Sequence, residues 1–388
     1  MGAGMRTIGL WLGLAVLGCS GDTSEGEEEG PVFVESEGCD STPLYERPAD
    51  PAERGPWPVG ARTVQIGRLD VEVLYPAEPG SEAGLSPLEV DIRYALPESE
   101  REKVTDDVRP HQTCDCYSDL PLDEAHGPYP LVLFVHGTAS WRTQSLSLME
   151  HWASRGFVVA SADHPGLWLS DILGSVCGLP TSGSQDLLGD LQTVLAGFND
   201  GDEVLDFVAD WTDLDQVAVI GHSAGANAAT GAAELPGVQV VVSMAGSGSP
   251  ADETGLESAL FLGGMADSVV SFSQTQSAFD QTSASRKLVG VAEGGHLIFS
   301  DICELTNGDG QDLVEIATEA GVCGTQFASF LFDCAASTIP VEDASAIVKA
   351  ATTWELETHL HCDSSQDAFG EFGERDDWIV VLESEEMD

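Results

Sequence analysis

Basic residues are scarce in this chain, which has 15 Lys and Arg against 66 Asp and Glu and a formal net charge of −51 at pH 7. The acidic residues are spread along the body of the sequence as well as near its beginning. A protein that binds nucleic acid needs basic patches to meet the phosphates. We therefore expect neither nucleic acid nor a polyanionic substrate among the partners.

A calcium loop is missing as well, because no Asp-x-Asp-x-Asp-Gly run is present. Long apolar runs are also lacking. The chain begins with one basic residue, Arg6, and then a short apolar run over residues 8–17. That run is too short to span a membrane as a stable helix, and it is typical of a secretory signal. The sequence thus predicts export.

The end of this run, Val-Leu-Gly-Cys at residues 16–19, resembles the lipobox of bacterial lipoproteins. In such proteins the cysteine is lipid-modified and becomes the new N-terminus, so the resemblance implies a membrane anchor at Cys19. A smaller residue is commoner at the position of Leu17, and the alternative is a signal peptide cut elsewhere. Ser20, rather than an acidic residue, follows the cysteine, which in a bacterium with two membranes favours sorting to the outer membrane. The sequence does not indicate which face of the membrane carries the protein.

The composition suggests four parts. Residues 1–19 are predicted to be the signal peptide. Residues 20–58 are predicted to be an acidic, disordered tether and lead-in, because large apolar side chains are nearly absent at its start. Residues 59–362 suit one large α/β domain better than two. The rest, 363–388, is predicted as an acidic tail, in which residues 378–382 fit either an edge strand or a docked end.

Nine cysteines are present, and eight remain when Cys19 is set aside. An even number in an exported chain predicts up to four disulfides, with the pairing left open. His111, Cys114 and Cys116 have the residue types of a zinc site. They lack a second Cys/His pair at ligand spacing, so a structural disulfide is favoured over zinc.

The strongest motif is an apolar strand over residues 217–220 that runs directly into Gly-His-Ser-Ala-Gly at 221–225. In a nucleophile elbow the serine occupies a strained turn that lifts its hydroxyl above the sheet, and its neighbours must be small. Small residues also fill the predicted helix after Ser223, which can direct its N-terminal dipole at developing negative charge. We therefore predict that Ser223 is a nucleophile; a purely structural turn is the alternative.

Apolar strands and amphipathic helices alternate around this motif. Period-two alternation predicts half-exposed strands before residue 95, and continuous apolar runs predict strands buried on both faces. This order predicts an α/β fold, a mostly parallel, doubly wound sheet with antiparallel N-terminal strands and helices on both faces. Predicted strands are residues 62–66, 69–75, 88–94, 129–135, 157–162, 238–244 and 287–291, and predicted helices include residues 146–153, 187–198 and 341–361.

An oxyanion hole is predicted from two backbone N–H groups. The strand over residues 129–135 ends in His-Gly-Thr-Ala, and in this architecture the loop after that strand donates to the substrate oxygen. We assign the donors as the amides of Thr138 and Ala224. His136 is interpreted as a packed support for the loop.

A base and an acid are expected after the serine. Asp267 lies just past the carboxyl end of a buried strand, and His296 lies on a glycine loop after the next strand. The order Ser223, Asp267, His296 is that of α/β-hydrolases, with His296 as base and Asp267 as the orienting acid. Rivals for the acid are Asp252, Glu253 and Asp301; rivals for the base, His359 and His361, are interpreted as solvated residues of a polar helix.

Five segments resemble the secreted α/β-hydrolases related to platelet-activating-factor acetylhydrolase, to bacterial cutinase-type polyester hydrolases and to chlorophyllase or dienelactone hydrolase. They are residues 135–137, 154–159, 221–225, 263–267 and 296–301. The last segment is more similar to the acetylhydrolases, whereas the spacing of the three triad residues is more similar to the cutinase type. The resemblance covers about residues 63–301 and implies an enzyme without a metal or organic cofactor. The tether, the insert with Cys114 and Cys116 and the region after Cys303 depart from it.

We therefore expect a lipid-anchored serine hydrolase that cleaves a small-molecule or lipid carboxylic ester. Trp141, Trp168 and Leu169 are candidates for an apolar wall around the acyl group, with a core role equally open. One alternative is a surface lipoprotein that uses a hydrolase scaffold only for binding. Another is a peptidase or amidase with the same triad. The sequence carries no sign of an oligomeric state.

Overall fold

The computed structural model describes residues 34–251, 255–328, 332, 334–363, 372–374 and 376–387, together with Met1. Its strands are β1 (Glu35–Glu37), β2 (Pro43–Tyr45), β3 (Val59–Ile66), β4 (Leu69–Pro76), β5 (Glu89–Val90), β6 (Gln112–Thr113), β7 (Tyr117–Ser118), β8 (Tyr129–Val135), β9 (Val158–Ala162), β10 (Thr212–His222), β11 (Val238–Met244), β12 (Ser258–Gly264), β13 (Arg286–Val291) and β14 (Ile379–Glu385). Its helices are α1 (Glu98–Arg101), α2 (Leu146–Ser154), α3 (Leu169–Cys177), α4 (Leu187–Asp200), α5 (Ala224–Gly231), α6 (Phe272–Gln281), α7 (Leu313–Glu319) and α9 (Val341–Leu360).

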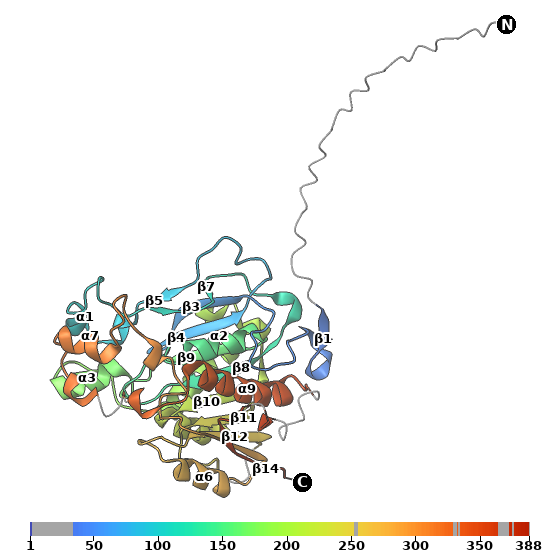
Figure 1. Cartoon of the computed structure of the whole chain (residues 1–388). Helices are drawn as coiled ribbons and strands as arrows, with labels where there is room; N and C mark the ends of the chain where they lie inside the picture. Colours follow the sequence, from blue (N-terminus) through green and yellow to red (C-terminus); the bar gives the residue numbers. More distant parts are fainter. Residues whose placement is uncertain are drawn as a thin grey trace. The chain divides into compact units, whose positions relative to one another are not determined.

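A ten-stranded sheet runs through residues 59–385 in the order β14-β13-β12-β11-β10-β8-β9-β4-β3-β7 (Figure 1). Strands β8 to β13 are parallel, whereas β3, β4 and β14 join the sheet by antiparallel pairing. Every residue of β8 and of β12 is buried, as expected for strands covered on both faces. The predicted fold, a mostly parallel α/β-hydrolase sheet with antiparallel entry strands, is confirmed.

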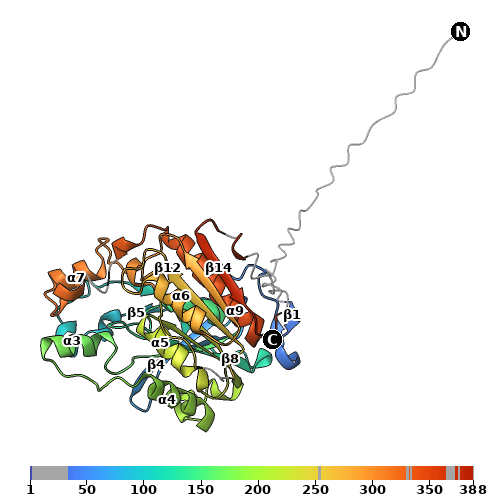
Figure 2. The same ribbon diagram turned by 90° about the horizontal axis from the view of Figure 1, so that it is seen from below.

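Helices cover both faces of this sheet, and Figures 1 and 2 show the two layers. Helices α2 and α9 pack on one face, where Trp152 and Ile347 belong to a continuous apolar core. Helices α4, α5 and α6 pack on the other, where Val194 and Phe279 belong to a second core. Each parallel crossover thus places its helix on a face and returns the chain to the same edge of the sheet, the edge at which β10, β12 and β13 end.

The predicted third entry strand over residues 88–94 is wrong. Only Glu89–Val90 forms a strand, and it pairs with β6 in a separate two-stranded sheet. The chain then turns into a 3-10 helix at Ile92–Ala95, where Asp91 accepts a hydrogen bond from the backbone N–H of Arg93. An aspartate that caps a turn in this way ends the extended backbone, although the alternation of apolar residues continues beyond it.

The globular body extends beyond the predicted boundaries at both ends. Of the predicted tether, residues 34–58 contain paired strands β1 and β2 and bury Leu44 and Trp57 in the core. A disulfide joins Cys39 to Cys362. In the predicted tail, β14 pairs with β13 and forms the edge of the sheet, so that of the two interpretations of residues 378–382 the edge strand is confirmed. A few large apolar side chains and one cross-link therefore dock segments whose composition is acidic.

Helix α9 is another correction, because its polar end is buried. Glu357 is fully buried, and its carboxylate contacts the guanidinium of Arg155 at 2.6 Å. The ring of His361 stacks on Phe157 at a centroid distance of 4.2 Å. Burial lowers the pKa of His361 well below its ordinary value. These residues were expected on a solvated surface, but partners about 200 residues earlier in the sequence neutralise and cover them.

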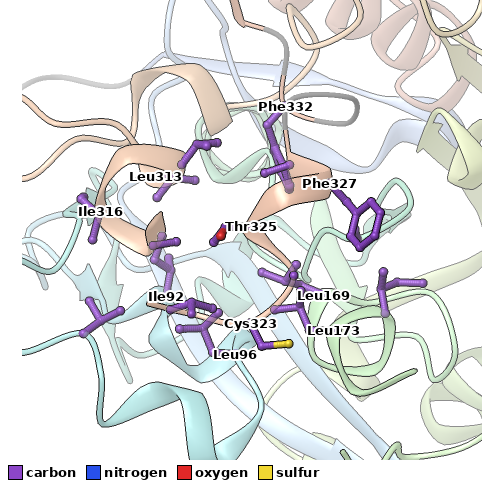
Figure 3. Close-up of a pocket in the computed structure, with 18 of the residues that line it drawn as sticks. Ile92, Leu96, Leu169, Leu173, Leu313, Ile316, Cys323, Thr325, Phe327 and Phe332 are labelled. Carbon is purple, nitrogen blue, oxygen red and sulfur yellow. The ribbon is translucent and has the colours of Figure 1, made fainter. Parts of the chain in front are cut away.

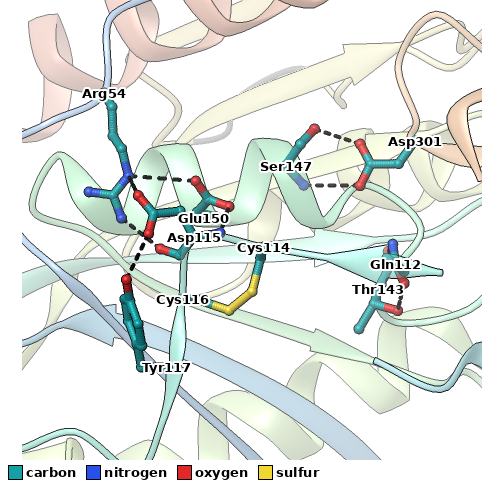
Figure 4. The surroundings of a disulfide bond; sticks show 10 residues. All are labelled: Arg54, Gln112, Cys114, Asp115, Cys116, Tyr117, Thr143, Ser147, Glu150 and Asp301. Carbon is teal, nitrogen blue, oxygen red and sulfur yellow. Dashed lines mark hydrogen bonds and ion pairs between the residues drawn. A yellow bond between two sulfur atoms is a disulfide. The ribbon is translucent and has the colours of Figure 1, made fainter. Parts of the chain in front are cut away.

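Four disulfides use the eight cysteines considered above, as predicted in number. They are Cys39–Cys362, Cys114–Cys116, Cys177–Cys323 and Cys303–Cys334. Figure 4 shows the second of these between β6 and β7, beside Arg54, Asp115 and Glu150, which form ion pairs. The favoured disulfide at Cys114 and Cys116 is therefore present in the structure.

No helix in the described part of the chain combines the length and apolar character needed to cross a membrane. Apart from Met1, the predicted signal peptide with its lipobox cysteine, Cys19, lies outside the described residues.

Candidate active site

Ser223 stands at the turn between β10 and α5, in a backbone conformation with φ 59° and ψ −116°. Positive φ is strained for a residue with a side chain and persists only where its surroundings enforce it. Here the backbone N–H of Ser223 donates to the carbonyl of Met244 at 2.9 Å, which fastens the turn to β11. The side chain is half-buried, so its hydroxyl is held at the surface of the sheet edge.

The two motif glycines are required by close backbone contacts. A Cβ on Gly221 would lie 2.1 Å from the carbonyl oxygen of Gly225, and a Cβ on Gly225 would lie 2.1 Å from that of Val135. Both distances are far below van der Waals contact. The turn thus brings the start of α5 against the end of β8, which is the strand that leads into the predicted oxyanion loop.

Asp267 and His296 meet across the ends of β12 and β13. Nδ1 of His296 lies 2.8 Å from Oδ2 of Asp267. The other carboxylate oxygen, Oδ1, accepts the N–H groups of Val269 and Val270 at 2.8 and 2.9 Å. With Nδ1–H donating to the carboxylate, Nε2 of the imidazole is left as a proton acceptor. This is the orientation that a general base requires.

The rival acids are placed differently. Asp301 binds the N-terminal turn of α2, where its carboxylate accepts from the backbone N–H and the hydroxyl of Ser147 at 3.0 and 2.5 Å (Figure 4). Burial raises the pKa of this carboxyl group. Asp252 and Glu253 lie outside the described residues. Of the carboxylates considered, the structure brings Asp267 to His296 and gives Asp301 another partner.

The loop after β8 lies against the serine. A Cβ built on Gly137 would lie 3.4 Å from Cβ of Ser223 and 3.2 Å from Nδ1 of His222, so the loop packs closely against the serine turn. Thr138 follows and is exposed, and Ala139 has a positive φ of 58°. The structure therefore brings the loop of Thr138 next to Ser223 and to Ala224, the first residue of α5.

A buried cluster of charged side chains anchors the same loop. The guanidinium of Arg142 contacts the carboxylates of Asp163 and Glu72 at 2.5 and 3.3 Å, and it lies 3.8 Å from the ring centroid of Tyr94. Asp163 also accepts the backbone N–H of Arg142 at 2.8 Å. Charge-assisted bonds of this kind, shielded from water, fix a loop more firmly than surface pairs do.

His136 is fully buried between the loop and the next strand. Its Nδ1 lies 2.8 Å from the carbonyl of Gly137, and its Nε2 accepts the N–H of His164 at 3.3 Å. Burial lowers the pKa of His136 to about 3, so the ring stays neutral. These contacts agree with the interpretation of His136 as a support.

A network that the sequence did not reveal links the three functional loops. Oε1 of Gln144 accepts the N–H of Gly137 at 2.8 Å, and Nε2 donates to Nδ1 of His222 at 3.0 Å. Nε2–H of His222 then donates to the carbonyl of His296 at 2.9 Å. The histidine inside the Gly-His-Ser motif was the one available signal for this network, since nothing in the sequence marks Gln144.

Of the three candidate wall residues, Trp141 and Leu169 line a pocket beside the loop after β8. The indole of Trp168 instead donates to the hydroxyl of Ser182 at 3.2 Å. Within the described ranges, no three or more His, Cys, Asp or Glu side chains are grouped so that they could hold a metal ion.

Residues 98–166 match the family model described as platelet-activating factor acetylhydrolase, isoform II. The matched stretch contains β8, the loop after it, α2 and β9; it ends before Ser223, Asp267 and His296. A comparison with curated protein sequences finds no match to the chain. The chain therefore has an α/β-hydrolase fold and is similar in sequence, over residues 98–166, to the platelet-activating factor acetylhydrolase family.

Proposed function

We propose that this protein hydrolyses carboxylic esters through an acyl-enzyme on Ser223, with His296 as base and Asp267 as orienting acid. The family match supports a serine esterase or acetylhydrolase-like hydrolase in general. The observation that carries the specific assignment is the contact between His296 Nδ1 and Asp267 Oδ2 at 2.8 Å. It supports an imidazole whose Nε2 is free to act as a base near the strained serine turn.

The chemistry follows from these positions. Ser223 Oγ attacks the ester carbonyl while His296 Nε2 takes the hydroxyl proton, and the Asp267 carboxylate stabilises the imidazolium. The negative charge on the former carbonyl oxygen is met by the backbone N–H groups of Thr138 and Ala224 and by the N-terminus of α5. His296 then returns the proton to the departing alcohol. Water, activated by the same base, releases the acid and restores Ser223.

The location is also part of the proposal. An export signal and lipidation of Cys19 would hold the enzyme on a bacterial membrane, with the outer membrane favoured, and bring it near lipid or small-molecule esters. The strongly acidic composition supports partners other than nucleic acid. Mass spectrometry of the protein purified from membranes tests the anchor: a diacylglyceryl group on Cys19 is the expected result, and an unmodified N-terminus elsewhere would contradict it.

The activity is tested with nitrophenyl esters of increasing acyl length, with a nitroanilide as the amide control. The purified full chain is compared with its Ser223→Ala variant, and circular dichroism verifies that both are folded. We expect ester cleavage by the wild type, a loss of at least about 1000-fold in the variant, and little cleavage of the anilide. Folded wild-type protein that cleaves none of the esters would contradict the proposal, and preference for the anilide would favour a peptidase or amidase.

A further inference from the structure

An apolar pocket opens beside the loop after β8, between three segments that are distant in sequence (Figure 3). One wall comes from Ile92 and Leu96, the second from α3 with Leu173, and the third from α7 and the residues after it. The cavity has a volume of about 130 Å³ and widens into open solvent at its mouth.

Cross-links hold these walls in place. The disulfide Cys177–Cys323 joins α3 to the segment after α7, and Cys323 itself lines the pocket. The backbone N–H of Cys323 donates to the carboxylate of Glu100 at 2.7 Å, which ties the first wall to the third. These links fix Cys323 against α3 and Glu100 before any ligand binds, which reduces the ordering that binding would require there.

The lining has the chemistry of a hydrocarbon site. Arg93 alone among the described lining residues has a charged side chain. Its guanidinium is occupied by the carboxylates of Asp91 and Asp106, at 2.5 and 2.7 Å. At the rim, Phe327 and Val176 are 56 % and 47 % exposed. The chain has a net charge of −51, but no Asp or Glu is among the described lining residues. Such a lining is suited to an uncharged, apolar group.

The pocket reaches the loop that adjoins the nucleophile. Ala139 and Trp141, both in this loop, line it. Gly137, next to Ser223, is two residues from Ala139, a span of at most about 8 Å. The pocket is thus close enough to receive a chain attached to a carbonyl at Ser223.

The direction of the pocket distinguishes the two halves of an ester. The leaving alcohol must lie near His296, because the imidazole returns a proton to it. The described pocket lining includes Ala139 and Trp141 of the loop after β8. From the loop that carries His296, Leu297 packs in the same apolar cluster as Trp141 but is not part of the lining. A chain in the pocket therefore extends from the acyl side of the carbonyl.

We propose that this pocket binds the acyl chain of the substrate, and that the preferred substrates are esters of acids with an extended hydrocarbon chain rather than acetyl esters. The proposal rests on the ester hydrolysis proposed above and specifies its substrate class. The fatty acid released by hydrolysis carries a carboxylate. The negative charge of the protein surface repels this carboxylate, which favours release of the product.

The test uses two substrate ladders and a variant that fills the pocket. Ala317, on α7, is half-buried and lines the pocket, so Ala317→Trp adds volume without removing a core side chain. Leu188→Trp on α4 is the matched control at an exposed apolar position. One ladder varies the acyl chain of a nitrophenyl ester from acetate to dodecanoate, and the other varies the alkyl alcohol of an acetate ester.

In the wild type, kcat/KM should rise about tenfold or more from acetate to octanoate and stay nearly flat along the alcohol ladder. Ala317→Trp should lower the octanoate to acetate ratio at least about tenfold, while Leu188→Trp matches the wild type. Leu313→Gln, which makes the wall polar, gives a second variant should the first fail to fold. An unchanged ratio in the folded pocket variants, or a preference that follows the alcohol ladder, would overturn the proposal.

A binding measurement separates this inference from the proposed function. N-phenyl-1-naphthylamine, a neutral apolar probe, should fluoresce on the wild type, be displaced by 1-decanol, and bind at least about tenfold more weakly to Ala317→Trp. If no ester is cleaved but the probe shows this pattern, the function fails and the apolar pocket stands as a binding site. Equal probe binding to the wild type and the variant overturns the pocket assignment whatever the activity.

Discussion

Nε2 of Gln144 donates a hydrogen bond to Nδ1 of His222 at 3.0 Å. The same Gln144 side chain accepts a hydrogen bond from the N–H of Gly137. His222 in turn donates to the backbone carbonyl of His296. The positions of the oxyanion loop, the serine turn and the base are thereby coupled. Burial, followed by the electrostatic interaction with His296, lowers the pKa of His222 well below its ordinary value, so His222 acts as a neutral bridge.

Replacing Gln144 by Leu should therefore impair catalysis although Gln144 does not touch the reacting atoms. Small displacements of catalytic groups can cost up to about 100-fold in rate. We expect kcat to fall about 10- to 100-fold with a much smaller change in KM, measured on a preferred nitrophenyl ester. The control Gln239→Leu removes a hydrogen bond to Asp215 far from these loops and should retain activity. A folded Gln144→Leu variant with wild-type kcat would show that the bridge does not position the site.

Asp267→Asn keeps the size of the side chain but removes the charge that stabilises the imidazolium and selects its tautomer. In serine hydrolases with this arrangement the loss is about 10³- to 10⁴-fold in kcat, and we expect the same here. Asp301→Asn serves as the matched control, since its carboxylate binds Ser147 instead. Rate assays on the two folded variants decide between the acids: a larger loss in Asp301→Asn would reverse the assignment.

His151 makes stability depend on pH. Its ring is buried on α2, Nε2 lies 2.9 Å from the carbonyl of Pro51, and burial lowers its pKa to about 3. In the unfolded chain a histidine titrates near 6.5. The unfolded state therefore binds more protons between these values, so the stabilisation is complete above about pH 6.5 and is lost as the pH falls toward 3.

The variant His151→Gln should accordingly flatten the pH dependence of the free energy of unfolding. Between about pH 6 and pH 4, its slope should be smaller than that of the wild type by roughly 1 kcal/mol per pH unit. Urea titrations at several pH values, with disulfides intact, provide the measurement. Gln281→Ala, an exposed change on α6, is expected to keep the wild-type slope. Parallel curves for His151→Gln and the wild type would contradict the prediction.

The disulfides should differ in their effect on stability. Cys39–Cys362 spans 323 residues, whereas Cys114–Cys116 spans 2. In the chain-entropy model a longer loop constrains the unfolded state more. Replacing both cysteines of the first pair by Ser should lower the free energy of unfolding by about 2–5 kcal/mol, and the same change in the second pair by less than about 2 kcal/mol. Denaturant titration compares the two, and the reverse order would argue against this mechanism.

Much of the fold could be predicted because local patterns and long-range structure agree. The apolar run at residues 129–135 and the strand-turn-helix pattern around Ser223 each require a buried parallel strand, and the structure contains both. Chain order was sufficient to propose His296 with Asp267, because the carboxyl ends of parallel strands gather at one edge of the sheet.

The parts that could not be predicted depend on contacts between distant residues. Glu355 and Glu357 look solvent-exposed in sequence, but Lys287 and Arg155 pair with them inside the protein. Leu44 docks a segment whose composition resembles a tether. Gln144 has no local signal at all, since its role exists only once Gly137 and His222 are beside it. Composition and periodicity carry no information on such pairs.

The central claim is that Ser223 is the nucleophile, and covalent labelling tests it most directly. An alkyl phosphonate that reacts with activated serines is incubated with the purified full chain, and mass spectrometry of peptides locates the adduct. The account predicts one adduct on Ser223, no labelling of Ser223→Ala, and labelling of Asp267→Asn slowed by about 100-fold or more. A folded protein that remains unlabelled, or that carries the adduct on another serine, would contradict it.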